Sequence, residues 1–355
     1  MGTHSPLLST PLLLIFGLSL PLACTQAEDV DSELRSGQGH GHGHGHGHGH
    51  GHGHGHGHDD GDDEGCELAS IVIPGNSLYP EGISADPDEG TLYFGGAANG
   101  ALMKVTPCEG EPEVVSAPGT FRNVIGVAWD AERERVWVCN NDLSFTTPPR
   151  LELVDPSDGS IVASHDFGAP GFCNDITYDK HHNVYATDSL GHRIVRIDGC
   201  DADDDTPVET WAAPPEFDAG PAFSLNGITF DGHDRFYVAY IEGGSIFAVD
   251  IDDGEFAGVT EISLDVPPLA GPDGLYWMGK DTLLLVESGN TRISTIELDG
   301  DEGHLSVIDN TLDFPTTAGV IGDSAWVLEG KLDHLFGIDP SPVDLPFTIA
   351  RVELD

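Results

Sequence analysis

The sequence predicts an all-β fold, a six-bladed β-propeller with four-stranded blades. A short pattern recurs six times, with spacings from 44 residues (125 − 81) to 52 residues (226 − 174). Repeats of this length built from short strands are typical of propellers, in which each repeat forms one blade. Gly (46) and Pro (24) are frequent, as many tight turns require, and no long helical periodicity is present. The six copies are Pro80-Glu81-Gly82-Ile83, Val124-Ile125-Gly126-Val127, Cys173-Asn174-Asp175-Ile176, Leu225-Asn226-Gly227-Ile228, Pro272-Asp273-Gly274-Leu275 and Thr316-Thr317-Ala318-Gly319.

Each repeat is expected to supply a strand at the pattern, an apolar second strand, a third strand, an acidic turn and a fourth strand. The second strands are rich in β-branched and aromatic residues, which favour half-buried strands. They read Leu92-Tyr93-Phe94, Val136-Trp137-Val138, Val184-Tyr185-Ala186, Phe236-Tyr237-Val238, Leu283-Leu284-Leu285 and Ala325-Trp326-Val327.

The ends of the repeat region predict how the ring closes. The last repeat stops after a third strand at residues 349–352, and a spare strand at residues 68–73 precedes the first pattern. Pairing these two segments would complete the last blade and remove exposed sheet edges. We therefore expect the propeller to occupy residues 66–355.

The N-terminal segment, residues 1–24, is interpreted as an export leader. Its apolar run, Leu12 to Leu22, has the length of a signal peptide and is too short to span a membrane. The run ends in Leu20-Pro21-Leu22-Ala23-Cys24, which resembles the lipobox of bacterial lipoproteins and makes Cys24 a candidate for lipidation. Cleavage after Ala27 is the alternative. We expect an outer-membrane or cell-surface lipoprotein anchored to the membrane through Cys24, or otherwise a periplasmic or secreted protein.

Residues 25–65 are interpreted as a disordered tether. The dipeptide Gly-His occurs ten times in residues 39–58, and an acidic run follows at residues 59–64. A segment that is half glycine cannot offset its chain entropy, whereas closely spaced neutral imidazoles bind Zn, Ni or Cu. A flexible spacer whose charge rises at low pH is the alternative. The candidate transition-metal ligands are His40, His42, His44, His46, His48, His50, His52, His54, His56 and His58.

Charge and cysteine content restrict the possible partners and the compartment. Lys plus Arg number 14 against 61 Asp plus Glu, a net charge of −47, which argues against nucleic-acid binding. Export permits disulfides, for which Cys139 with Cys173 and Cys66 with Cys108 are the candidate pairs; Cys200 is the fifth cysteine after the leader.

The second position of the repeated pattern predicts a site on the propeller axis. Equivalent residues of successive blades surround the central channel, so Glu81, Asn174, Asn226 and Asp273 should face one another. Carboxylate and amide oxygens are ligands for hard cations, and Ca²⁺, Mg²⁺, Mn²⁺ or Zn²⁺ could be held, with copper and nickel disfavoured. The neighbouring polar residues Asp175, Asp188, His181 and His182 are interpreted as turn or blade-packing groups.

These repeats resemble the senescence marker protein/gluconolactonase/luciferin-regenerating enzyme family of six-bladed propellers. Within that family, they look more like the uncharacterised branch than like the sugar-lactone enzymes. The resemblance covers residues 66–355 and rests on Tyr79-Pro80-Glu81-Gly82, Phe172-Cys173-Asn174-Asp175, Asn226-Gly227-Ile228 and Pro272-Asp273-Gly274. It implies that Glu81, Asn226 and Asp273 hold one divalent cation and that Asn174 binds the substrate.

The activity implied by the resemblance is metal-dependent hydrolysis of a lactone or related ester. Asp273, as a ligand and general base, and Asn174, which would orient the substrate, are the implied catalytic residues. The chain departs from the family because Gly171-Phe172-Cys173 stands where the lactonases carry an arginine, and Ile125 and Thr317 are expected in the ring. A non-catalytic ligand-binding or scaffold propeller with a structural ion is the alternative.

Overall fold

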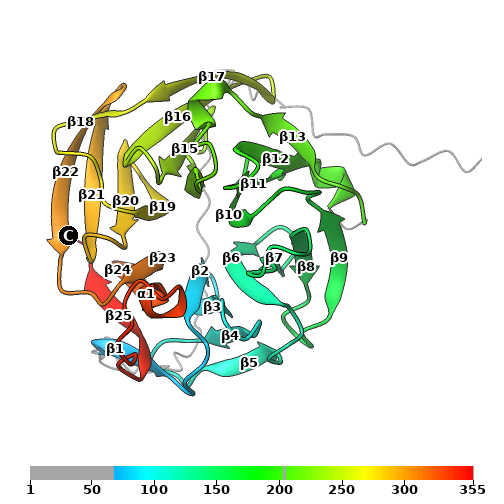
Figure 1. The fold of residues 1–355 in the computed structure, drawn as a ribbon, viewed down its shortest axis with the longest axis vertical. Helices are drawn as coiled ribbons and strands as arrows, with labels where there is room; N and C mark the ends of the chain where they lie inside the picture. The colour runs from blue at the N-terminus through cyan, green and yellow to red at the C-terminus, as the bar shows by residue number, and fades with distance from the viewer. Residues whose placement is uncertain (1–67, 203–204, 355) are drawn as a thin grey trace, which may run out of the picture. The chain divides into compact units, whose positions relative to one another are not determined.

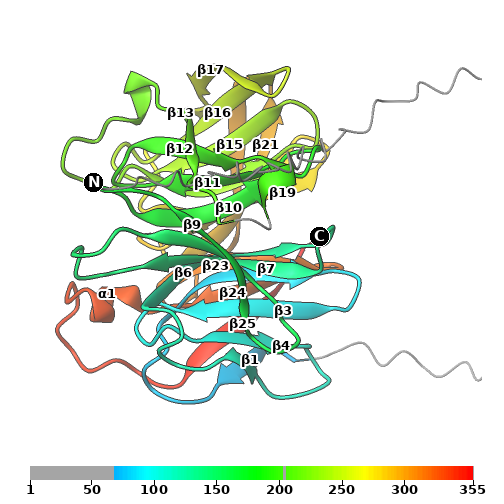
Figure 2. The same ribbon diagram turned by 90° about the vertical axis from the view of Figure 1, so that its right-hand side faces the viewer.

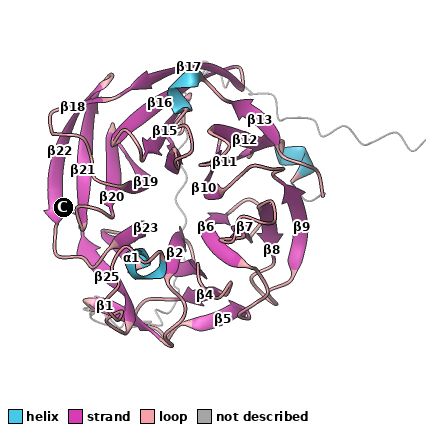
Figure 3. Ribbon diagram, in the orientation of Figure 1, coloured by secondary structure: helices cyan, strands magenta, loops and turns pink. Residues whose placement is uncertain are grey.

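The computed structural model describes residues 68–202 and 205–354, which form six antiparallel sheets arranged as the blades of a propeller (Figure 1). Strands dominate, as Figure 3 shows, and the helices are short: α1 (Leu332–Leu335) and two 3₁₀ turns, Gly199–Asp201 and Pro215–Phe217. None of the helices in the described part of the chain is long and apolar enough to cross a membrane. The predicted six-bladed, all-β fold is confirmed.

Five blades follow the chain from the innermost strand outwards, and a short fifth strand adds to the fifth blade. The first is β2 (Pro80–Asp86), β3 (Thr91–Gly96), β4 (Leu102–Val105) and β5 (Glu113–Ser116); the second is β6 (Asn123–Asp130), β7 (Arg135–Asn141), β8 (Arg150–Val154) and β9 (Ile161–Asp166). The third is β10 (Cys173–Tyr178), β11 (Val184–Asp188), β12 (Arg193–Ile197) and β13 (Glu209–Ala212); the fourth is β14 (Leu225–Phe230), β15 (Arg235–Tyr240), β16 (Ser245–Asp252) and β17 (Glu255–Glu261). The fifth is β19 (Pro272–Gly279), β20 (Thr282–Glu287), β21 (Arg292–Asp299) and β22 (Glu302–Asp309), with β18 (Ser263–Leu264) pairing parallel to β22.

The sixth blade joins the two ends of the propeller. It consists of β23 (Pro315–Ile321), β24 (Ser324–Glu329), β25 (Phe347–Glu353) and, outermost, β1 (Ser70–Ile73). β1 runs antiparallel to β25, with Ser70 opposite Ala350 and Ile73 opposite Phe347. The predicted closure by an N-terminal strand is therefore confirmed.

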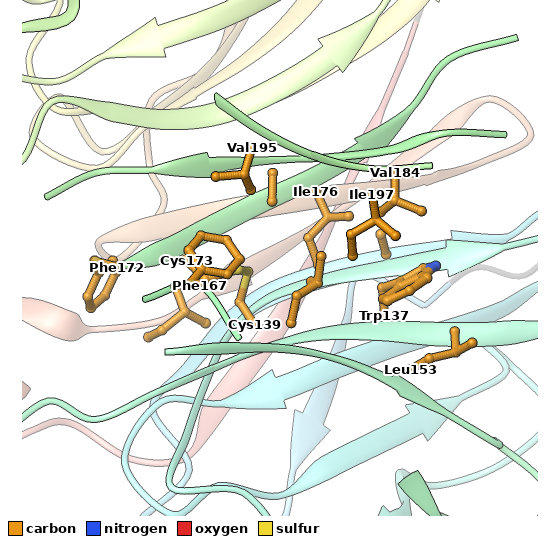
Figure 4. Close-up of a cluster of buried hydrophobic side chains, with 14 of the residues drawn as sticks. Trp137, Cys139, Leu153, Phe167, Phe172, Cys173, Ile176, Val184, Val195 and Ile197 are labelled. Atoms are coloured by element: carbon orange, nitrogen blue, oxygen red, sulfur yellow. A yellow bond between two sulfur atoms is a disulfide. The ribbon is translucent and has the colours of Figure 1, made fainter. Parts of the chain in front are cut away.

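The hydrophobic core is divided among the six interfaces between neighbouring blades. Apolar side chains of adjacent blades form one buried cluster at each interface. Figure 4 shows the cluster between the second and third blades, where Trp137 packs near Val184 and Ile197. The interface between the first and last blades is built in the same way, with Phe94 and Trp326 in one cluster. Each blade thus depends on both neighbours for burial of its faces.

Candidate functional site on the propeller axis

All six innermost strands carry the same irregularity, a β-bulge near their first residue. In β2, the step from Pro80 to Ile83 spans three residues while the partner strand moves only from Gly96 to Phe94. The same three-to-two offset occurs in the other five blades. A bulge redirects side chains at its position and often lies beside functional sites.

The two middle residues of these bulges form two stacked rings around the axis. The first bulge ring consists of Glu81, Ile125, Asn174, Asn226, Asp273 and Thr316, and the second bulge ring of Gly82, Gly126, Asp175, Gly227, Gly274 and Thr317.

The sixth copy differs from the sequence prediction, which placed Thr317 with Glu81. The register pairs Pro315 with Glu329 and Ala318 with Val327, so Thr316 is the equivalent residue. Its Oγ1 donates a hydrogen bond to the carbonyl oxygen of Glu81 (2.7 Å), which links the last blade to the first at the axis.

Glycine dominates the second bulge ring because neighbouring backbones approach closely there. A Cβ atom on Gly82 would lie 2.2 Å from the carbonyl oxygen of Ile125, and one on Gly227 would lie 2.2 Å from that of Asp273. Such distances exclude a side chain without displacement of the next blade. This contact sets the spacing of the donor groups in the first bulge ring.

The predicted axial residues Glu81, Asn174, Asn226 and Asp273 come together and are nearly inaccessible. Their exposed fractions are 6%, 6%, 9% and 7%, respectively. Buried carboxylates and amides at this density need partners, since an isolated buried charge is strongly unfavourable.

Hydrogen bonds hold the two asparagines with their amide nitrogens towards the channel wall. Asn174 Nδ2 donates to Ser189 Oγ (3.0 Å), and this hydroxyl in turn donates to the carbonyl oxygen of Leu225 (2.5 Å). Asn226 Nδ2 donates to the carbonyl oxygen of Pro272 (3.4 Å). The Oδ1 atoms of both amides are therefore left available for a ligand.

Electrostatics at the axis is dominated by three carboxyl groups. Burial raises the pKa of Glu81 well above its usual range, and the charges of Asp273 and Asp175 raise it further. Burial and the charge of Asp175 likewise raise the pKa of Asp273. Burial raises the pKa of Asp175 to about 6. No basic side chain in the described ranges enters any of these shifts, so the donor set fits a divalent cation, which would favour the ionised forms.

Asp175 has the predicted blade-packing role and, in addition, adds a third carboxyl group beside the axis. It occupies the second bulge ring, where four blades have glycine. Its carboxylate accepts hydrogen bonds from the amide nitrogens of Ile176 and Ile228, both at 2.9 Å. The sequence did contain a signal for its place beside the axis, because Asp175 stands at a position of the repeated pattern where four other copies have glycine.

Asp188, His181 and His182, which were predicted to be turn or blade-packing residues together with Asp175, also have structural roles. Asp188 is buried, accepts a hydrogen bond from the amide of Phe172 (2.8 Å) and pairs with Arg193 Nε at 2.8 Å. His181 and His182 lie exposed in the turn between β10 and β11.

A cavity of about 300 Å³ lies along the innermost strands at the level of the second bulge ring and beyond it. Asp175, Thr317 and Tyr178 are among its lining residues. The Tyr178 hydroxyl is buried and has no hydrogen-bond partner among the described residues, and burial raises its pKa well above the usual range. Asp175 is the axial carboxyl group that lines this cavity, and apolar residues such as Ile83 and Ile228 form much of its wall.

A disulfide and an aromatic group support Asn174. Cys139 of β7 is bonded to Cys173 of β10, with a Cα–Cα separation of 5.3 Å, which confirms the predicted pairing (Figure 4). Phe172, directly before this cysteine, packs edge-on against Phe223 at a centroid distance of 4.9 Å. The residue preceding Asn174 is thus covalently tied to the neighbouring blade.

Several predicted features lie outside the described residues. These are the leader and Cys24, the tether with the ligand candidates His40 to His58, and Cys66. Cys108 and Cys200 are disulfide-bonded.

Comparison with known proteins identifies the fold. No protein-family model and no curated protein sequence matches the chain. The structure is similar to that of luciferin-regenerating enzyme (TM-score 0.57, 16% identity, 81% of this chain and 92% of that one). It is also similar to virginiamycin B lyase from Staphylococcus aureus (0.55, 15%, 81% and 98%) and to the calcium-binding protein regucalcin from Agrobacterium tumefaciens (0.54, 16%, 81% and 98%). The predicted resemblance to six-bladed propellers of the luciferin-regenerating enzyme type is confirmed at the level of the fold.

Proposed function

We propose that the chain is an exported, metal-dependent hydrolase of a lactone or related ester, with a divalent cation on the propeller axis. The observation that carries the proposal is the axial set of two buried carboxyl groups, Glu81 and Asp273, one partly buried carboxyl group, Asp175, and two oriented amide oxygens, without a basic partner in the described residues. The similarity to luciferin-regenerating enzyme and to a calcium-binding protein supports it at the level of the fold, because the same fold carries an enzyme in one case and a calcium-binding protein in the other.

The cation ligands in this proposal are Glu81, Asn226 and Asp273, and Ca²⁺, Mg²⁺, Mn²⁺ or Zn²⁺ fits the donor set. When bound, the cation supplies Lewis acidity that polarises an ester carbonyl and acidifies a water molecule. Asp273 would accept the proton of the attacking water as the general base.

Asn174 would position the substrate. One of its two N–H groups is committed to Ser189, which leaves the second N–H and Oδ1 for the substrate ring. Glycine, phenylalanine and cysteine precede it at residues 171–173, so no arginine at these positions is available for a negatively charged substrate. An uncharged lactone is therefore the preferred class.

The N-terminal features complete the proposal. Export follows from the leader, with anchoring to the membrane if Cys24 is lipidated and a periplasmic or secreted protein otherwise. The Gly-His tract would bind transition-metal ions and keep them near the propeller.

Turnover of a lactone panel tests the proposal. The metal-loaded protein should hydrolyse at least one uncharged lactone, EDTA should abolish turnover, and Asp273→Asn should lower kcat/KM by at least about 100-fold. Asp158→Asn, in a turn of the second blade, is the matched control and should leave turnover unchanged. Absence of turnover with all four cations would favour a binding propeller with a structural ion, a function consistent with the apolar Ile125 in the first bulge ring.

A further inference from the structure

A second group of metal-ligating side chains lies outside the axis, in the connection between β24 and β25. This segment, residues 330–346, contains α1 and carries Asp333, His334 and Asp339. One donor atom from each of the three lies within 4.8 Å of the others. A trio at this separation can converge on one ion with small side-chain rotations.

The segment lies on the face of the propeller where the innermost strands begin. Glu329, the last residue of β24, pairs with Pro315, the first residue of β23. Figures 1 and 2 show α1 projecting from one face of the ring near β23. A Cβ atom on Gly330 would lie 2.4 Å from the carbonyl oxygen of Pro80, so the segment starts in contact with the residue before Glu81.

His334 is held as a metal ligand usually is. Its Nδ1 donates to the carbonyl oxygen of Ser341 (3.1 Å), which fixes the proton on Nδ1 and leaves Nε2 as a free electron-pair donor. The amide of Ser341 also donates to Asp339 Oδ1 (2.8 Å) and orients that carboxylate. One residue therefore positions two of the three donors.

The side chain of Asp333 gives a second observation that favours a cation at this site. Its Oδ1 is buried and has no hydrogen-bond partner among the described residues. The neighbouring Lys331 does not provide one, because its ammonium is engaged by Asp313 and by the carbonyl oxygen of Asp344, both at 2.8 Å. A buried carboxylate oxygen without a donor is unfavourable unless a cation or proton satisfies it.

We propose that Asp333, His334 and Asp339 bind a zinc-like transition-metal ion, in addition to and independently of the axial cation. One imidazole nitrogen and two carboxylate oxygens suit Zn²⁺ with an open fourth position, whereas the all-oxygen axial site suits a harder ion. The ion joins α1 to residue 339 and thereby stabilises the segment on the face where the innermost strands begin.

Hydrogen exchange of the full chain tests this site without interference from the Gly-His tract, because it is measured in peptides covering residues 331–346. The amides of residues 336, 337, 338 and 339 donate to carbonyl oxygens inside the segment and report its opening. If Zn²⁺ binds only the closed segment, free Zn²⁺ at ten times the Kd slows this exchange about 11-fold.

The slowing should disappear in His334→Gln and in Asp339→Asn, and persist in His304→Ala, an exposed histidine that pairs with Asp265 instead. Unchanged exchange in the blade strands of each variant without Zn²⁺ shows that the fold is intact. No slowing in the wild-type protein, full slowing in His334→Gln, or equal slowing by Ca²⁺ would overturn the assignment.

Discussion

Replacement of Asp175 by asparagine should stabilise the metal-free protein at neutral pH. Burial raises the pKa of this carboxyl group from its ordinary value of 3.8 to about 6. The folded state therefore favours the protonated form, so stability falls as the pH rises from about 4 through about 6 and then stays constant. The difference between a pKa of 3.8 and one of about 6 corresponds to at most about 3 kcal/mol of stability.

The Asp175 carboxylate accepts hydrogen bonds from the amide nitrogens of Ile176 and Ile228, both at 2.9 Å. Asparagine keeps one side-chain oxygen as an acceptor but removes the negative charge. The weaker acceptor reduces the gain, so Asp175→Asn should raise the free energy of unfolding by about 1–3 kcal/mol at pH 7.5. At pH 3.5, where the acid is protonated in the folded state and mostly protonated in the unfolded state, the change should be close to zero.

Urea denaturation in EDTA at both pH values measures this difference. A saturating divalent cation should reverse the effect at pH 7.5, because the negative charge of Asp175 then favours the bound ion. A loss of stability in EDTA that is the same at pH 3.5 and pH 7.5 would refute the reasoning, since Asp175 would then act through its hydrogen bonds and not through its charge.

Three further predictions concern the framework that carries the axial site. Serine at both Cys139 and Cys173 should lower the free energy of unfolding by about 2–4 kcal/mol in urea denaturation, and an unchanged value would show that the disulfide does not constrain the chain. Gly227→Ala should lower the melting temperature, because its Cβ would lie 2.2 Å from the carbonyl oxygen of Asp273; a wild-type melting temperature would contradict the close approach. Deletion of residues 68–74 should expose β25 and cause aggregation or unfolding by light scattering and circular dichroism, and a stable monomer would refute closure by β1.

The fold could be predicted from the sequence because the strand pattern that defines a blade is short and recurs along the chain. Short apolar strands recur at blade spacing, and the spare strand before Pro80 matches the strand missing after Val352. The repeat register made Cys139 and Cys173 a candidate pair, since Cys139 lies on the second strand of one blade and Cys173 on the first strand of the next, and the structure confirms the disulfide.

The axial site was predicted only in part because the bulge changes which side chains face the channel. Strict alternation along a strand would turn Asp175 away from the axis if Asn174 faces it. The bulge adds one residue and places both positions in rings around the channel. The sixth copy was shifted by one residue because Pro315-Thr316-Thr317-Ala318 has neither an acid nor a glycine to fix its alignment.

The group formed by Asp333, His334 and Asp339 has no sequence spacing that identifies it. It depends on the turn of α1 and on hydrogen bonds from the amides of residues 338 and 339 to the carbonyl oxygen of Asp333. Only the folded connection brings the three side chains together.

The most direct test of the central claim is the thermal stability of the wild-type protein and Glu81→Gln, each with Ca²⁺, Mg²⁺, Mn²⁺ or Zn²⁺ added after EDTA treatment. Binding to the folded propeller raises the melting temperature, whereas a cation that binds the folded and the unfolded chain equally does not. We predict that at least one of these cations raises the melting temperature of the wild-type protein and that Glu81→Gln removes most of that rise. An equal rise in Glu81→Gln with Ca²⁺, Mg²⁺ or Mn²⁺, an equal rise with Zn²⁺ when both proteins also carry His334→Gln, or no rise with any of the four cations, would contradict a cation site on the propeller axis.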